Sequence, residues 1–167
     1  MLNQAQIEKK AAEVLETAGI HRAPVDVERI ASKLGAQIEF EKADDEISGA
    51  LFRLAIPVIG VNSTHPLNRQ RFTIAHEIAH LVLHNDSAHT DYRNVVSSQA
   101  TDPKEIEANK FAAAILMPEY LIRKSVAKRT KPLDESAIRR LSVVYRVSAQ
   151  AMALRLTNLG IAVDMSS

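Results

Sequence analysis

Two histidines and a glutamate stand close together near the middle of the chain, in the order His76-Glu77-x-x-His80. On an α-helix, residues four apart lie on the same face, about one turn or roughly 5–6 Å from each other. The two imidazoles can therefore bind one metal ion. Glu77 would flank that ion, where it is suited to take a proton from a metal-bound water and pass it to a leaving amine. This spacing is typical of zinc peptidases.

The same five residues also occur by chance on surface helices that carry two histidines and an acid. The flanking sequence argues against that alternative, because the segment from Arg71 to His84 is mostly apolar and would bury both imidazoles. Buried imidazoles need polar partners, and a shared metal ion would supply one to each. The context therefore favours a metal site.

A catalytic zinc ion normally has three protein ligands and one open position. The longer motif that adds a third histidine is absent, because Leu83 and Asp86 occupy its glycine and histidine positions. The remaining candidates for the third ligand are two acids of a later predicted helix, Glu105 and Glu107. Spacing favours Glu105, whose helical face continues with small and apolar residues. Glu107 shares its face with Lys110 and is expected to be more solvated.

The residues around these acids suggest a capping role for Glu105 and supporting roles for Asn109 and His84. Asp102 and Glu105 also fit a capping box at the start of the later helix. Asn109, one turn after Glu105, could hold the free ring nitrogen of a ligand. His84 lies one turn after His80, but one straight helix cannot easily wrap three ligands around an ion. We therefore expect His84 to support the site instead of binding the metal.

The residue that would stabilise a developing oxyanion is not specified by spacing. The candidates are His84, His89, Tyr92 and Arg71. For Arg69 and Arg71, structural ion pairs are the stronger expectation. His21 and His65 are expected at helix ends or on the surface.

Periodicity predicts the elements that position these residues. Apolar spacing predicts a central helix that begins near Pro66 and carries the motif. It also predicts helices at residues 4–18, 24–35, 103–117, 118–128, 134–145 and 148–159. Alternating apolar and polar residues predict strands at 36–41, 48–55 and 58–61. The polar segment 85–101 is expected to be a long loop.

The expected fold class is α+β and mostly helical, with a small antiparallel sheet packed near a zincin-like active-site helix. The expected division is a zincin-like domain over residues 1–131 and a small C-terminal helical subdomain over residues 132–167. The last two predicted helices in this subdomain are joined by a short turn, as in a helix-turn-helix.

Composition limits the classes of partner. The chain has 167 residues, a formal net charge of +1 and no cysteine. A metal site must then use histidine and carboxylate ligands, and the charge gives no global case for nucleic acid or an anionic membrane. The longest apolar runs fall short of the ~20 residues of a membrane span, and the first residues lack a signal-peptide pattern. We expect a soluble cytoplasmic protein.

Beyond the motif, much of the sequence resembles the ImmA/IrrE-type zinc metallopeptidases, which are gluzincin-like. The matching stretches are residues 24–35, 47–50, 69–84, 105–118 and 147–160. The resemblance implies one zinc ion per chain, held by His76, His80 and Glu105, with Glu77 as general acid and base. It further implies cleavage of a helix-turn-helix repressor, or membership of a toxin–antitoxin pair, in a stress response or transcription regulation.

Two other functions are compatible with the sequence. The helix pair at the C-terminus could bind DNA, but its second helix carries Arg155 as its one cation, whereas DNA binding needs several phosphate contacts. Direct nucleic-acid binding is therefore not expected. The other alternative is a protein-interaction regulator that keeps a structural zinc site only for stability.

Overall fold

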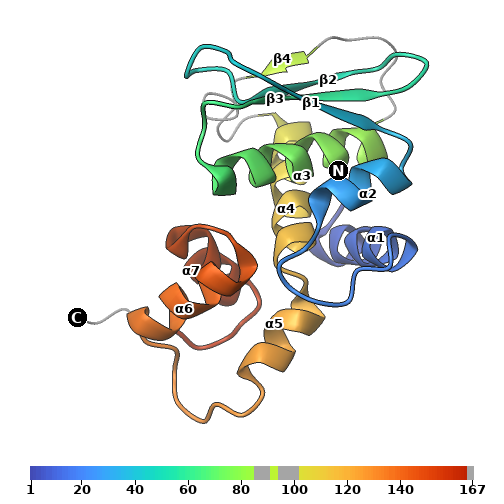
Figure 1. Ribbon diagram of the computed structural model, residues 1–167. Helices are drawn as coiled ribbons and strands as arrows, with labels where there is room; N and C mark the ends of the chain where they lie inside the picture. The colour runs from blue at the N-terminus through green and yellow to red at the C-terminus, as the bar shows by residue number, and fades with distance from the viewer. Residues whose placement is uncertain (85–90, 94–101, 165–167) are drawn as a thin grey trace.

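The computed structural model describes the backbone of residues 1–84, 91–93 and 102–164, and the side chains of 1–84 and 102–164. Within these ranges the chain forms seven helices and four strands (Figure 1). In chain order they are α1 (Gln4–Thr17), α2 (Val27–Lys33), β1 (Gln37–Glu41), β2 (Gly49–Phe52), β3 (Val58–Asn62), α3 (Leu67–Leu83), β4 (Asp91–Arg93), α4 (Pro103–Leu116), α5 (Glu119–Val126), α6 (Glu135–Tyr145) and α7 (Ala149–Asn158). The predicted α+β class is confirmed.

The sheet is mixed, with strand order β1-β3-β2-β4. Strand β2 pairs antiparallel with β3 and with β4, but β1 runs parallel to β3, with Gln37 opposite Val58. The expectation of an antiparallel sheet is therefore wrong for this pair, because alternation reports which face is buried and not strand direction. The expectation of a loop is also wrong at Asp91–Arg93, where β4 forms; the remainder of segment 85–101 lies outside the described residues.

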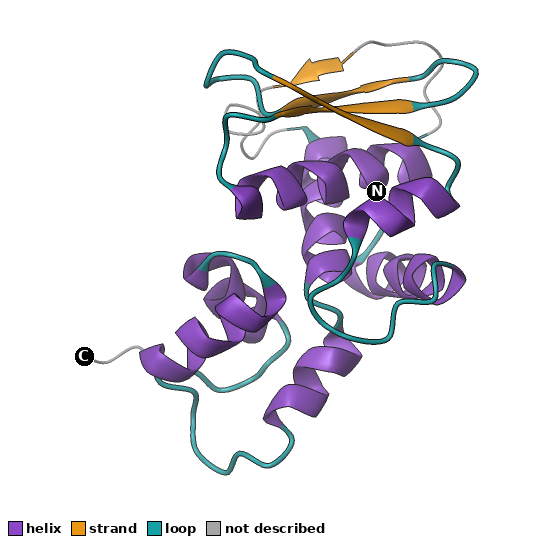
Figure 2. Ribbon diagram, viewed as in Figure 1, coloured by secondary structure: helices purple, strands orange, loops and turns teal. Residues whose placement is uncertain are grey.

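The sheet forms one layer that covers α3, while α4 and α1 lie on the opposite side of α3 (Figure 2). Gly49 lies at the contact between the sheet and this helix. A Cβ atom at Gly49 would lie 2.4 Å from Thr73 Cγ2 and 2.6 Å from the carbonyl oxygen of Gly60. A side chain at this position would therefore require Thr73 and the backbone of Gly60 on β3 to move.

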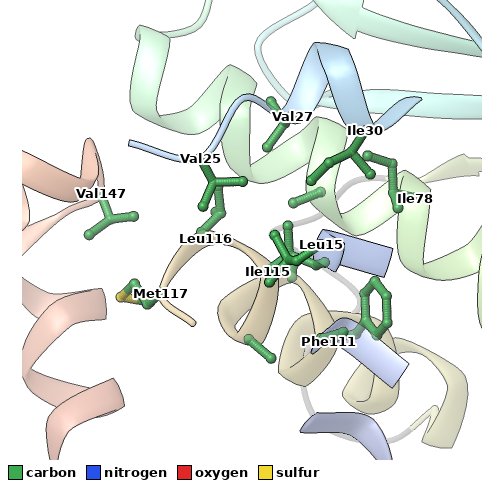
Figure 3. Close-up of a cluster of buried hydrophobic side chains, with 14 of the residues drawn as sticks. Leu15, Val25, Val27, Ile30, Ile78, Phe111, Ile115, Leu116, Met117 and Val147 are labelled. Atoms are coloured by element: carbon green, nitrogen blue, oxygen red, sulfur yellow. The ribbon is translucent and has the colours of Figure 1, made fainter. Parts of the chain in front are cut away.

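A buried apolar core joins the first four helices (Figure 3). It includes Leu15 of α1, Ile30 of α2, Ile78 of α3, and Phe111 and Ile115 of α4, all of which are buried. Because α3 and α4 share this core, their relative position is fixed by packing as well as by any metal ion. None of the helices in the described ranges is both long and apolar enough to cross a membrane.

Helices α6 and α7 form a pair beside the C-terminal end of α4 (Figure 1). Their N-termini are capped by the side chains of Asp134 and Ser148, and Arg146 adopts a left-handed conformation between them, with φ of 52°. A parallel bridge between Leu133 and Val163 joins the two ends of this segment. The pair is thus closed by its own backbone hydrogen bonds.

One buried side chain ties this pair to the rest of the molecule. Arg155 of α7 is 3% exposed and donates from Nε to the carbonyl oxygen of Met117 at 3.0 Å. Its two terminal nitrogens donate to the carboxylate of Glu8 on α1, one of them at 2.9 Å. This bidentate ion pair connects the two ends of the chain.

Candidate metal centre

The motif residues lie on α3 where the helix is buried. His76, Glu77 and His80 are 0%, 2% and 7% exposed. Glu105 is 1% exposed and lies in the first turn of α4, which packs against α3. Asp102 caps α4 by accepting a hydrogen bond from the backbone of Lys104 at 2.9 Å. Glu105 itself faces the two histidines instead of serving only at the helix end.

Three side chains converge between α3 and α4. His76 Nε2 lies 3.2 Å from Glu105 Oε2, and His80 Nε2 lies 3.2 Å from Glu105 Oε1. The two Nε2 atoms are 3.0 Å apart. In a tetrahedral zinc site with bonds of about 2.0–2.2 Å, neighbouring ligand atoms are about 3.3 Å apart. The observed spacing and the His2Glu donor set therefore fit a zinc ion.

The partner of His76 selects the tautomer that such a site needs. His76 Nδ1 lies 3.0 Å from Asn109 Oδ1, one turn after Glu105 on α4. With the amide oxygen in that position, it accepts the Nδ1 proton. The Nε2 lone pair of His76 then points toward His80 and Glu105. Asn109 has the position that its spacing predicts for the partner of a ligand.

A second set of contacts begins at the other ring nitrogen of His80, Nδ1. His80 Nδ1 is 3.0 Å from His84 Nδ1, and His84 Nε2 is 3.1 Å from Glu107 Oε2. The other oxygen of Glu107 accepts a hydrogen bond from the backbone N–H of Leu2. Both ring nitrogens of His84 are engaged in these two contacts. Neither is therefore available to donate a hydrogen bond to an oxyanion.

Glu107 does not lie on a solvated face, contrary to the expectation from its spacing. It is 7% exposed, because Leu2 and His84 cover it. Burial by itself would raise the pKa of Glu107. The hydrogen bonds from the Leu2 backbone and from His84 outweigh it, so the pKa of this carboxyl lies below its ordinary value.

Arg53 also supports the site and was not anticipated from the sequence. It follows β2, and its Nη2 donates to the carbonyl oxygens of His80, at 2.7 Å, and His84. A cation at these carbonyls stabilises the C-terminal end of α3. A single arginine after a short strand carries no sequence signal for this role.

The other predicted residues have mostly structural contacts. Arg69 donates to Ser48 Oγ at 2.9 Å and Arg71 to the carbonyl oxygen of Val25 at 2.8 Å, so these bonds are not to carboxylates. His65 precedes α3 but is buried, with Nε2 3.0 Å from the carbonyl oxygen of Asp45. His21 is exposed. The side chains of two further oxyanion candidates, His89 and Tyr92, lie outside the described residues.

Known proteins are similar to this chain in sequence or in fold. The model of peptidase family M78, described as the IrrE N-terminal-like domain, matches residues 31–157. The radiation response metalloprotease IrrE of Deinococcus radiodurans is 36% identical over 102 residues, which are 60% of this chain and 30% of that protein.

A solved structure of a Mycobacterium tuberculosis transcriptional regulator superposes on 90% of this chain with a TM-score of 0.63. At 16% identity this likeness concerns the fold alone. The chain spans 30% of the length of IrrE and 46% of the length of the regulator chain. The matched range, residues 31–157, contains His76, Glu77, His80 and Glu105. The chain therefore belongs to the IrrE N-terminal-like family of M78 metallopeptidases.

Proposed function

We propose that this chain is a zinc-dependent endopeptidase that cleaves a helix-turn-helix transcriptional repressor or an antitoxin-type partner. The observation that carries the proposal is the convergence of His76, His80 and Glu105 beside the buried Glu77. In this assignment the first three residues hold one zinc ion per chain. The repressor as substrate rests on the family resemblance, and a repressor substrate would imply a reaction in the cytoplasm.

In the proposed reaction, different residues of this chain have different catalytic and supporting roles. A bound zinc ion supplies Lewis acidity toward a peptide carbonyl and acidifies water. Glu77 takes the proton from the attacking water and returns it to the leaving amine. Asn109 keeps the Nδ1 proton on His76, so that Nε2 of that ring carries the lone pair for metal binding. The low exposure of these side chains excludes bulk water and strengthens their electrostatic interactions.

The α6–α7 pair is a candidate for substrate docking within the proposed subdomain 132–167. A cleft of about 480 Å³ lies between this pair and the body of residues 1–131. Phe72 and Asn109, which both contact His76, line one side of the cleft, and Val147 and Leu154 line the other. The cleft is not lined by the metal ligands themselves. It adjoins the site and supports docking of a partner there.

The direct test is incubation of the zinc-loaded chain with helix-turn-helix repressors encoded beside its gene, followed by mass analysis of the products. We expect two fragments from one repressor, loss of cleavage with a chelator, and recovery after zinc is restored. Intact repressors after incubation with the zinc-loaded protein would contradict the proposal.

A further inference from the structure

A buried chain of hydrogen bonds runs from the metal centre to the N-terminal segment. It contains His80, His84, Glu107 and the backbone N–H of Leu2, with separations of 3.0 Å between the two rings and 3.1 Å from His84 to Glu107. The three side chains are 7–8% exposed. Water therefore cannot readily replace any of these contacts.

The Glu107 carboxylate at the end of this series of hydrogen bonds determines which atom is the donor in each of them. A carboxylate only accepts hydrogen bonds, and Glu107 accepts one at each oxygen, from Leu2 and from His84. His84 must then carry its proton on Nε2, which leaves its Nδ1 as an acceptor when the ring is neutral. His80 donates from Nδ1 to that acceptor, and its Nε2 keeps a lone pair toward His76 and Glu105.

We propose that Glu107 and His84 are positioning residues that fix the tautomer and ring orientation of His80 for metal binding. The inference rests on the proposed function, and it extends the metal centre to the segment before α1 through Leu2. Asn109 contacts His76 directly. For His80 two residues are involved, because His84 contacts His80 and Glu107 contacts His84. Partners of metal ligands typically contribute about 10–100-fold to metal affinity.

The test measures zinc affinity by competition with a chelating indicator in the full chain. His84→Phe keeps a ring but removes the acceptor for His80, and Glu107→Leu removes the carboxylate. Each is expected to weaken zinc binding by about 10–100-fold. Glu107→Gln should recover part of the loss, because its amide oxygen can still accept from His84. The matched control is His65→Phe, the same substitution at a buried histidine that contacts Asp45, with zinc affinity unchanged.

A measurement on the unmodified, zinc-loaded protein covers the case in which a variant does not fold. Long-range nitrogen–proton NMR spectra of 15N-histidine-labelled protein distinguish the two imidazole tautomers. The expected result is a proton on Nδ1 of His80 and on Nε2 of His84. The opposite tautomers, or unchanged zinc affinity in both His84→Phe and Glu107→Leu, would overturn the inference. Failure of the proposed function would appear differently, as a zinc-loaded wild-type protein that cleaves no repressor.

Discussion

At the scale of single residues, we assign different roles to Glu77 and Glu105, although both are buried acids beside the same histidines. Glu77 follows His76 on α3 and is assigned to proton transfer, whereas Glu105 reaches the two imidazoles from α4. Substitution of each residue should therefore affect a different measurable quantity.

Glu77→Gln keeps the shape of the side chain but removes its basicity. Cleavage of the repressor is expected to fall by about three orders of magnitude, the scale of losing a positioned general base. Zinc content should remain stoichiometric, because the three assigned ligands are intact. Kinetics together with metal analysis of the purified variant check both expectations, and full activity would contradict the role of Glu77.

Glu105→Ala removes one of the three converging groups. Its zinc affinity should fall by more than the about 10–100-fold expected for losing only the partner of a ligand. Glu107→Ala provides the comparison within the same helix, and direct metal analysis of both variants ranks them. Retention of zinc by Glu105→Ala at the wild-type level would remove Glu105 from the site.

At the scale of elements, the bidentate pair between Glu8 and Arg155 holds α7 against α1. Burial alone would raise the pKa of Glu8, but the hydrogen bonds and positive charge of Arg155 outweigh it. The pKa of Glu8 is therefore lowered from its ordinary value of 4.5. A carboxyl whose pKa is lowered by folding stabilises the folded state above its unfolded pKa, and this stabilisation is lost as the pH falls through the folded pKa.

Glu8→Ala leaves Arg155 buried without its carboxylate and should lower the free energy of unfolding at pH 7. We expect a loss of about 3 kcal/mol, the lower end for a broken buried pair, because Glu8 retains some contact with solvent. The difference from wild type should shrink as the pH falls below 4.5. Denaturant unfolding at several pH values measures this dependence.

The control is Glu135→Ala at the exposed pair with Arg139, four residues apart on α6. That pair should contribute about 0.5 kcal/mol or less. A loss of similar size in the two variants would show that the Glu8–Arg155 pair does not hold α7.

The same ion pair bears on DNA binding. Arg155 is the one cation of α7, and it is buried against Glu8 and the backbone of Met117. A recognition helix contacts phosphates and bases through exposed polar side chains. Helix α7, which would be the recognition helix, therefore presents no exposed cation for such contacts.

The helices were predictable from the sequence, whereas parts of the sheet were not. The helices were predictable because caps such as Asp134 and Ser148 and the apolar period mark them locally. The parallel direction of β1, the short strand β4 and the burial of Glu107 were not predictable. Each depends on segments distant in sequence, such as the contact of Leu2 with Glu107. The motif predicted His76 and His80 as ligands, and spacing favoured Glu105 over Glu107 without excluding either.

At the scale of the whole molecule, the metal centre lies against a large apolar core that does not depend on it. Ile78, Phe111 and Ile115 join α3 to α4 with no polar ligand involved. Removal of zinc by a chelator should therefore abolish cleavage while the helical circular dichroism spectrum persists at 25 °C. Unfolding on chelation would instead favour a structural zinc site in a protein-interaction regulator.

The close approach at Gly49 has a consequence for sequence variation. A methyl group there meets Thr73 and the backbone of Gly60. One at Gly60 meets the ring edge of Phe52 at 3.3 Å and the carbonyl oxygen of Ala50 at 3.8 Å, which is an ordinary contact distance. In a library of random substitutions sorted only for folded protein and counted by deep sequencing, position 49 should stay glycine while position 60 accepts alanine. Equal alanine frequencies at the two positions would contradict this. If position 49 stays glycine, the fold restricts substitution at a residue whose side chain has no chemical role.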